Sequence, residues 1–267
     1  MKALFFDVDG TLLDEETHRI PESAKRAVQL AQAQGHKVFI NSGRTFSMLQ
    51  KITRMISVDG WLCGCGTELI YNGQTIYKYC IEDRVKQRIK AAADRYNLVV
   101  ILEGYSGWHC APSASLLAGD SLLKERYEKA RSYVLAEGLI APEPYDSDYT
   151  LAKFCIQAGV SSDLSGFRKE FENEFIIIDR GHDFYECVPA GHGKDTAVAR
   201  MLEYLGLTRD DAYAFGDSTN DIAMFSACGH CTAMAQHAKA LEAFDPYITN
   251  SVKDDGILHA IEHFHLL

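Results

Sequence analysis

The sequence predicts an α/β fold, in which a doubly wound parallel sheet forms the core and an α+β domain is inserted into it. Strand-like and helix-like segments alternate at the start of the chain and again after Pro189, an order typical of a parallel sheet with helices on both faces. Between these parts, Asn72-Gly73 interrupts alternating apolar residues, the strongest short signal of a β-hairpin. We therefore expect a core of residues 1–81 and 188–267 and an inserted domain of residues 82–187.

The first part of the core follows from apolar runs and helix boundaries. Pro21 is typical of a helix start and Gly35 of a helix end. The expected elements are a strand at 3–8, a helix at 21–35, a buried strand at 37–41 and a helix at 45–56.

The remaining predicted elements form two groups, one typical of an α+β domain and one that returns to alternating strands and helices. The stretch from about residue 61 to 188 predicts the 67–79 hairpin, helices at 83–96, 120–136 and 162–173, and strands at 99–103, 152–158, 174–179 and 183–188. The returning core predicts helices at 194–206, 219–227 and 237–244 and strands at 211–217 and 231–234. One α/β domain is thus expected to be interrupted by one α+β segment.

Composition limits the classes of partner. The chain has 267 residues and a net charge of −10, with 47% apolar and 24% charged residues, which is ordinary for a globular protein. The negative charge argues against nucleic acid and anionic membranes as partners. No signal peptide and no run of about 18 apolar residues is recognised. We expect a cytoplasmic protein without membrane attachment or an obligate protein partner.

Four acidic residues follow two of the predicted strands. Asp7 and Asp9 end the first strand, and Asp217 ends a later one with Asp221 four residues on. In an open α/β sheet, ligands bind at the carboxyl ends of the strands. A single such Asp is most often a helix cap or turn residue, but four together without a cation would be strongly destabilising. Carboxylate-rich sites suit Mg²⁺.

Polar residues that could hold an anion occur elsewhere in the core. Ser42 and Gly43 follow another strand, where a hydroxyl and free backbone N–H groups make an anion site. Lys194 opens a helix and supplies a point charge, although a surface lysine is the simpler interpretation. The surrounding AGHGKDT is not a P-loop, because Val188 stands where the first glycine is required and Asp195 where Ser or Thr would hold the metal.

The cysteines and the C-terminal histidines offer weaker alternatives. CGHC at 228–231 has redox spacing, but it follows a helix rather than opening one. CGC at 63–65 lacks a second ligand pair for zinc. His259 and His263 lie four apart on an expected helix, where a solvated or packed face is the more common outcome. We expect buried or solvated side chains in all three places.

In its motifs the chain resembles the haloacid dehalogenase superfamily, and within it the Cof-type phosphatases with a C2B cap. The motifs are DVDGT at 7–11, SGR at 42–44, a helix-opening Lys194 and GDSTND at 216–221, in that order. The cap of that subfamily lies between the second and third motifs. The resemblance extends over the whole chain and implies a Rossmann-like core, a cap domain and a Mg²⁺-dependent phosphatase.

The resemblance also implies roles for individual residues. Asp7 would be the nucleophile and a Mg²⁺ ligand. Asp9 would protonate the leaving oxygen, activate water and ligate the metal through its carbonyl. Asp217 would bind Mg²⁺ directly, and Asp221 would lie in its outer shell or nearby. The residues that would hold the phosphate are Val8, Ser42, Gly43, Lys194 and Asn220. Arg44 would be directed to the substrate or the cap.

Three functions remain open from the sequence. The first is a phosphatase for small phosphate monoesters such as sugar phosphates; the second is a phosphomutase using the same aspartyl-phosphate; the third is a phospholigand-binding protein without turnover. CGT at 65–67 replaces the usual Asn-Gly-Ala of the subfamily near the site, which affects the expectation for the substrate. Possible substrate contacts in the insert, each more simply a surface or core residue, are Glu103, Tyr105, Trp108, His109 and Arg180.

Overall fold

The computed structural model describes residues 1–110, 112, 114–136, 138 and 148–267. They form two compact units, one of Met1–Lys78 with His192–Leu267 and one of Tyr79–Gly191. The boundaries expected from the sequence, 82 and 187, lie three and four residues inside the second unit. The expected α/β class with an inserted α+β domain is confirmed.

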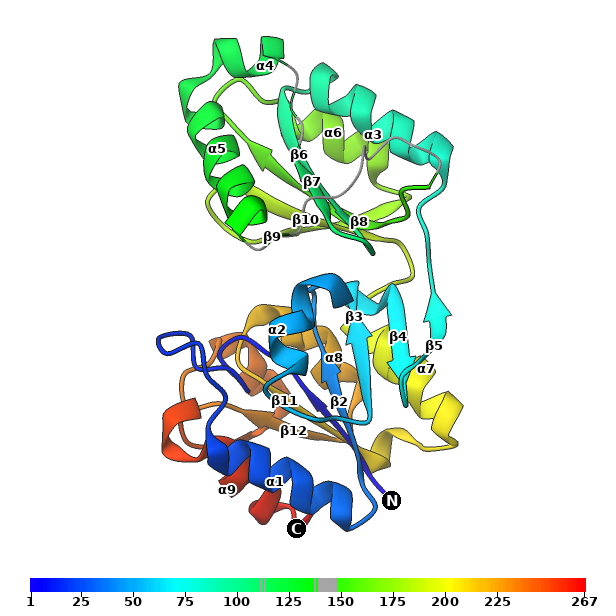
Figure 1. The fold of residues 1–267 in the computed structure, drawn as a ribbon, viewed down its shortest axis with the longest axis vertical. Helices are drawn as coiled ribbons and strands as arrows, with labels where there is room; N and C mark the ends of the chain where they lie inside the picture. The colour runs from blue at the N-terminus through cyan, green and yellow to red at the C-terminus, as the bar shows by residue number, and fades with distance from the viewer. Residues whose placement is uncertain (111, 113, 137, 139–147) are drawn as a thin grey trace. The chain divides into compact units, whose positions relative to one another are not determined.

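The core is built on an eight-stranded sheet (Figure 1). Its strands are, in spatial order, β13 (Tyr247–Ile248), β12 (His230–Ala233), β11 (Ala212–Gly216), β1 (Ala3–Phe6), β2 (Lys37–Asn41), β3 (Gly60–Cys63), β4 (Glu68–Tyr71) and β5 (Gln74–Lys78). From β13 to β3 neighbouring strands are parallel, and β4 and β5 extend the sheet antiparallel. The turn between β4 and β5 is the Asn72-Gly73 pair, and both residues have the positive φ that such a two-residue turn requires.

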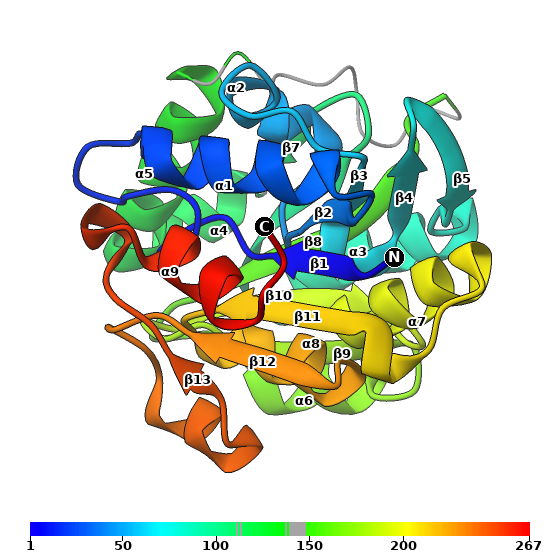
Figure 2. The same cartoon turned by 90° about the horizontal axis from the view of Figure 1, so that it is seen from below.

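Helices cover both faces of this sheet, as Figure 2 shows from below. On one face lie α1 (Glu22–Ala33) and α9 (Gly256–His263), side by side; on the other lie α7 (Lys194–Leu205) and α8 (Ile222–Ala227). The alternation of strand side chains explains this, since Leu4 and Phe6 point into the first cluster and Ala3 and Phe5 into the second. The two layers leave the carboxyl ends of the parallel strands to carry the polar residues.

Several sequence predictions for the core were wrong. The helix expected at 45–56 is a 3₁₀ turn, η1 (Phe46–Leu49), followed by one short α-helical turn, α2 (Gln50–Thr53). The segment expected as a helix at 237–244 is the 3₁₀ segment η5 (Lys239–Phe244). Strand β3 was not expected, because Gly60 lowers the strand propensity. The glycine is explained by the close approach of the neighbouring strand, since a Cβ there would lie 2.4 Å from the Ile70 carbonyl oxygen. The remaining 3₁₀ segments are η2 (Gly64–Gly66), η3 (Arg209–Asp211), η4 (Thr219–Asp221) and η6 (Val252–Asp254).

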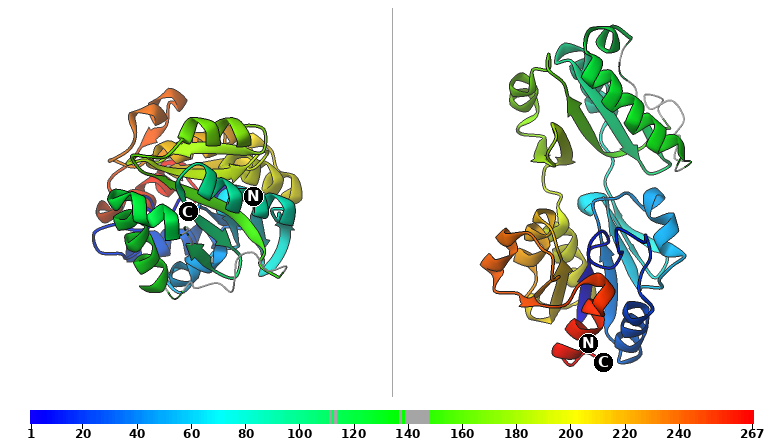
Figure 3. Two further views of the ribbon diagram at one scale, coloured as in Figure 1. Left: turned by 90° about the horizontal axis from the view of Figure 1, so that it is seen from above. Right: turned by 90° about the vertical axis from the view of Figure 1, so that its left-hand side faces the viewer.

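The inserted domain has its own antiparallel sheet (Figure 3). It also has its own apolar cluster. The strands are, in spatial order, β7 (Trp108–Cys110), β6 (Leu98–Gly104), β8 (Leu151–Ala158), β10 (Phe184–Pro189) and β9 (Phe175–Asp179). The helices are α3 (Asp83–Arg95), α4 (Ala114–Gly119), α5 (Ser121–Ala136) and α6 (Leu164–Phe171). Strand β7 and helix α4 were not expected from the sequence.

None of the helices in the described parts of the chain combines the length and the apolar character needed to cross a membrane.

Candidate active site

Three adjacent strands of the core deliver the polar residues of the site. Asp7 follows β1, Asp217 follows β11 and Ser42 follows β2. Because β11, β1 and β2 are neighbours and parallel, their carboxyl ends meet at one edge of the sheet. The Asp7 amide still donates to the Phe215 carbonyl at 3.0 Å, so the sheet ladder itself fixes where the first acidic residue begins.

Asp7, Asp217 and Asp221 form a carboxylate cluster at this edge. Each offers one oxygen, and these oxygens all lie within 4.8 Å of one another. In the described parts of the chain, no other group of three or more His, Cys, Asp or Glu side chains is close enough to share a metal ion. The donor atoms are all carboxylate oxygens, so the cluster fits a hard cation such as Mg²⁺.

Lys194 lies inside this cluster as the first residue of α7. Its Nζ is 2.7 Å from Asp7 Oδ1 and 2.6 Å from Asp221 Oδ1, and its side chain is 3% exposed. Its carbonyl accepts a hydrogen bond from Asn41 Nδ2 at 3.0 Å, which ties the start of α7 to the end of β2. The simpler interpretation of Lys194, an exposed surface residue, is therefore wrong.

The segment after β11 is stabilised by hydrogen bonds that its side chains make. Asp221 Oδ2 accepts hydrogen bonds from the amides of Asp217 (3.0 Å) and Ser218 (3.1 Å), so both of its oxygens are engaged. Ser218 Oγ donates to Asn220 Oδ1 at 2.6 Å. Asp217 Oδ1 accepts from the Thr11 hydroxyl at 2.8 Å. This network fixes the positions of the acidic side chains at the edge.

Two glycines make room for the carboxylates. Gly10 has φ +76°, and a Cβ there would lie 2.6 Å from Asp217 Oδ2. A Cβ on Gly216 would lie 2.6 Å from Asp221 Cγ. Both distances are shorter than real contacts allow, and the positive φ of Gly10 adds backbone strain to any substitution. Each glycine is needed because a carboxylate approaches the backbone closely.

The carboxylates outnumber the positive charge available to them. Burial raises the pKa of Asp7 to about 7, and the charge of Asp221 adds to the rise while Lys194 opposes it. Burial likewise raises the pKa of Asp217 to about 6. Burial alone would lower the pKa of Lys194, but the charges of Asp221 and Asp7 raise it above its ordinary value. The cluster therefore lacks positive charge that a divalent cation would supply.

Asp9 lies outside the carboxylate cluster and contacts Arg44. Arg44 Nε donates to Asp9 Oδ2 at 3.0 Å, and Arg44 Nη2 donates to Asp9 Oδ1 at 2.7 Å. The sequence had directed Arg44 to the substrate or the inserted domain and did not anticipate this contact.

The expected phosphate-binding residues surround the same strand ends. Val8 is buried between the two acids, and its carbonyl accepts the amides of the turn that follows. Ser42 is buried, and its Oγ accepts from the Arg44 amide at 3.2 Å. Gly43 and Asn220 are half-buried. Hydroxyl, amide and ammonium donors thus belong to one edge of the core.

Sequence reasoning assigned no role to two residues that the structure adds to the site. Thr11 donates to Asp217, and its only signal was its place two residues after Asp9. Asn41 is fully buried, and its Oδ1 has no hydrogen-bond partner among the described residues. A polar residue at the last position of a buried strand was the available signal.

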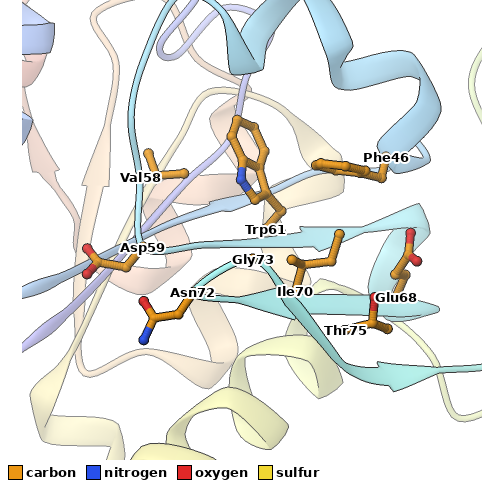
Figure 4. Close-up of a pocket in the computed structure, with 9 residues that line it drawn as sticks. All are labelled: Phe46, Val58, Asp59, Trp61, Glu68, Ile70, Asn72, Gly73 and Thr75. Carbon is orange, nitrogen blue, oxygen red and sulfur yellow. The ribbon is translucent and has the colours of Figure 1, made fainter.

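Two of the pockets on the core have similar volumes. One of about 430 Å³ opens beside the carboxylate cluster and is lined by Gly10, Asp14, Glu15, Glu16, Asp217, Gln236, Ser251, Val252, Lys253 and Asp254. The other, of about 410 Å³, lies on β3 to β5, where Figure 4 shows the side chains of Phe46, Trp61 and Ile70. The second pocket contains none of the residues that the sequence motifs single out, whereas Gly10 and Asp217 of those motifs line the first.

The weaker sequence alternatives gain no support. Burial raises the pKa of Cys228 well above its ordinary value and that of Cys231 to about 11, so both thiols stay protonated at neutral pH. His259 Nδ1 pairs with Asn250 Nδ2 at 3.0 Å, and His263 stacks on Tyr247. Neither pattern forms a redox or metal site in the described parts of the chain.

Polar residues singled out in the inserted domain are engaged within that domain. Glu103 Oε2 is 2.7 Å from Lys153 Nζ in the buried interior. Trp108 is buried against Tyr133. The Tyr105 hydroxyl donates to a backbone carbonyl of the same unit. These contacts agree with the simpler interpretation, that they are structural residues.

An α/β core interrupted by an α+β domain, with acids and a buried lysine at the ends of its parallel strands, defines the haloacid dehalogenase class of protein. The sequence model of the haloacid dehalogenase-like hydrolase family matches residues 4–261. The chain belongs to this family, and the resemblance drawn from its motifs is confirmed.

Individual relatives align over nearly their whole length. YkrA of Bacillus subtilis, whose name assigns it provisionally to the phosphatases, is 29% identical over 100% of this chain and 98% of its own. The 5-amino-6-(5-phospho-D-ribitylamino)uracil phosphatase YwtE of the same organism is 25% identical, with coverages of 98% and 97%. The solved structure of phosphatase BT1666 from Bacteroides thetaiotaomicron has a TM-score of 0.82 at 23% identity, with coverages of 100% and 96%. A solved sugar phosphatase of subclass IIB has a TM-score of 0.78 at 23% identity, with both chains fully covered.

Proposed function

We propose that this protein is a Mg²⁺-dependent phosphatase that hydrolyses small phosphate monoesters through an aspartyl-phosphate on Asp7. The observation that carries the proposal is the meeting of Asp7, Asp217 and Asp221 around Lys194 at one sheet edge. Membership of a hydrolase family supports the class, a phosphoric monoester hydrolase. The names of relatives support it further: one names a phosphatase provisionally, and two others name phosphatases of small phosphate compounds.

In this proposal the two acids of the first motif, Asp7 and Asp9, have separate roles in the reaction. An oxygen of Asp7 bonds to phosphorus while the bond to the leaving oxygen breaks, and Asp9 gives that oxygen a proton. A water molecule then bonds to phosphorus, Asp9 takes its proton, and the bond to Asp7 breaks to release inorganic phosphate. Splitting hydrolysis in this way replaces one difficult step by two easier ones, and proton transfer of this kind contributes about 10²–10⁴-fold.

Phosphoryl transfer places negative charge on the phosphoryl oxygens, and catalysis depends mainly on stabilising that charge. In this proposal the buried ammonium group of Lys194, beside Asp7, stabilises this negative charge. In this proposal the Ser42 hydroxyl, the backbone at Val8 and Gly43, and the Asn220 side chain add donors around the phosphate. Preorganised donors in a water-poor site cost no reorganisation when the charge develops.

Mg²⁺ would be held by Asp7, Asp217 and the carbonyl of Asp9. Asp221 would act from the outer shell, since its oxygens are already engaged by Lys194 and two amides. When bound, Mg²⁺ supplies a Lewis acid that offsets the negative charge of the phosphate and the carboxylates.

The substrate class is proposed from relatives and from the domain plan. One structural relative is described as a sugar phosphatase, and a sequence relative as a phosphatase of a phosphoribityl compound. We propose sugar phosphates or related metabolites as substrates and the inserted domain, residues 82–187, as the cap that selects among them.

The test is a panel of metabolite phosphates measured with Mg²⁺, with EDTA and with Asp7→Asn. We expect phosphate release that needs the metal and is lost in the variant. Full turnover by Asp7→Asn would exclude the covalent route. Transfer of phosphate to a second hydroxyl would identify a phosphomutase instead, and tight binding without release would identify a phospholigand-binding protein.

A further inference from the structure

The Arg44–Asp9 contact has a geometry that a single charge pair lacks. Two guanidinium nitrogens, Nε and Nη2, each meet a different oxygen of the Asp9 carboxylate, at 3.0 and 2.7 Å. Two parallel bonds to one planar fork fix the plane of the carboxylate as well as its distance. The contact therefore sets the direction of the Asp9 oxygens.

The backbone of Arg44 is itself held in place. Its amide donates to Ser42 Oγ at 3.2 Å, and its carbonyl accepts from the Gly64 amide at 2.8 Å. The Ser42 carbonyl in turn accepts from the Cys65 amide at 3.2 Å. The loop after β2 is thus fixed against η2, and the Arg44 side chain starts from a rigid base.

Stability alone does not account for this pair. The side chains of Arg44 and Asp9 are 30% and 38% exposed, and exposed pairs contribute only about 0–1 kcal/mol because water screens them. The inserted domain contains a pair of similar exposure, Arg88 with Glu174, whose side chains are 41% and 39% exposed. There a single guanidinium nitrogen, Nη1, donates to both carboxylate oxygens, at 2.6 and 2.9 Å. That second pair provides a matched control.

We propose that Arg44 is a positioning residue for Asp9: it holds the carboxylate in line for proton transfer and does not bind the substrate. The inference rests on the proposed function, in which Asp9 gives a proton to the leaving oxygen and then takes one from water. Arg44 forms no covalent bond and moves no proton. Its effect passes entirely through the carboxylate that it orients.

The experiment compares five forms of the full chain with Mg²⁺ and p-nitrophenyl phosphate. They are the wild type, Arg44→Gln, Arg44→Lys, Asp9→Asn and the double variant Asp9→Asn with Arg44→Gln. Rapid mixing measures the release of p-nitrophenolate in the first turnover, and phosphate release measures hydrolysis of the aspartyl-phosphate. Because p-nitrophenolate leaves without a proton, only the second step needs Asp9.

For Arg44→Gln we expect the first-turnover rate and KM to stay within about threefold of the wild type. Phosphate release should fall by about 10–100-fold, part of the contribution of a general base. Arg44→Lys should fall by about tenfold, because an ammonium keeps the charge but loses the fork. With Asp9→Asn already present, adding Arg44→Gln should change the rate by less than about twofold, since no carboxylate remains to be oriented.

The control Arg88→Gln should leave both steps as in the wild type. A large rise in KM for Arg44→Gln would instead make Arg44 a substrate contact. Losses that simply multiply in the double variant, or equal losses in both steps, would make its role structural; either outcome overturns the inference while the phosphatase function stands. A wild type that releases phosphate from no ester of the panel overturns both.

Discussion

Two of the lysines that the structure describes as buried, Lys194 and Lys153, each lie between two carboxylates. In the core, Lys194 is 2.7 Å from Asp7 and 2.6 Å from Asp221. In the inserted domain, Lys153 is 2.7 Å from both Glu103 and Glu186. Both lysine side chains are 3% exposed. Distance and burial therefore do not distinguish a reactive cluster from a structural one.

Charge balance and place in the strand distinguish them. The inserted cluster lies within β6, β8 and β10, and Arg180 approaches Glu186 at 3.8 Å, so two acids face two bases. The core cluster lies where strands end and adds Asp217, so three acids face one base. An excess of negative charge at the strand ends favours the binding of a cation. A cluster within the strands whose positive and negative charges balance stabilises the sheet instead.

The strongest test of this comparison removes one acid from each cluster. Asp7→Asn should lower the rate of phosphate release by at least about 10⁴-fold, because the nucleophile is lost. Glu103→Gln, the matched change, should leave the rate within about threefold and lower stability instead. Phosphate release by both variants at equal protein concentration is the measurement. Comparable losses of rate in the two variants would end the distinction.

Removing each lysine tests the charge balance. Lys153→Met leaves buried acids without their partner and should cost about 3–5 kcal/mol of unfolding free energy. Mg²⁺ should not restore this loss. Lys194→Met should also destabilise the protein, but Mg²⁺ should recover part of the loss, because the cation replaces positive charge among three carboxylates.

Urea unfolding of both variants, each with Mg²⁺ and with EDTA, measures these changes. Recovery of Lys153→Met by Mg²⁺, or none for Lys194→Met, would contradict the assignment of the cation to the core cluster.

Much of the core site could be predicted from the sequence because parallel strands end at one edge. Asp7 and Asp217 each follow an apolar run, and adjacent strands bring such residues together without knowledge of any side chain. The Asn72-Gly73 hairpin was predictable for a similar reason, since the turn needs residues that accept positive φ.

The features that could not be predicted depend on contacts between residues that are distant in the sequence. Arg44 reaches Asp9 across 35 positions, and a loop residue carries no periodicity that fixes its direction. The apolar pattern of residues 45–56 suits a helix, but the structure has a 3₁₀ turn and one short helical turn there. The position of Lys153 between two glutamates is set by strand register, which the sequence alone does not give.

A smaller effect on the rate is expected when the space beside the core cluster is filled by a substitution at Gly10. Gly10→Ala would place a Cβ 2.6 Å from Asp217 Oδ2 at φ +76° and should cost about 1–3 kcal/mol of stability. The rate should fall by about 10–100-fold, because displacing a reacting group by about 1 Å costs about 10²-fold. Gly73→Ala, also at positive φ (+76°) but with nothing within 4 Å of its Cβ, should lose stability but keep its rate. Thermal unfolding and phosphate release separate the two effects; equal rates in both variants would contradict the close approach.

The smallest effect is the pH dependence of metal stabilisation. The pKa of Asp7, about 7, and that of Asp217, about 6, lie above the ordinary 3.8, so the folded protein binds these protons more tightly than the unfolded chain. Their contribution to stability is full below about pH 4 and is lost as the pH rises towards 7. Mg²⁺ must displace these protons at pH 5 but not at pH 8, and its stabilisation should therefore grow with pH.

The measurement is the rise in Tm on adding Mg²⁺ to metal-free protein at pH 5 and at pH 8. We expect a rise about 2–4 °C larger at pH 8, which corresponds to roughly 1 kcal/mol for a chain of this size. Asp7→Asn should reduce the difference, because Asp7, whose pKa is about 7, no longer titrates. Glu103→Gln should preserve it, because the inserted cluster holds no cation. Equal rises at both pH values would show that protons and Mg²⁺ do not compete, and the charge surplus that separates the two clusters would then have no measurable consequence.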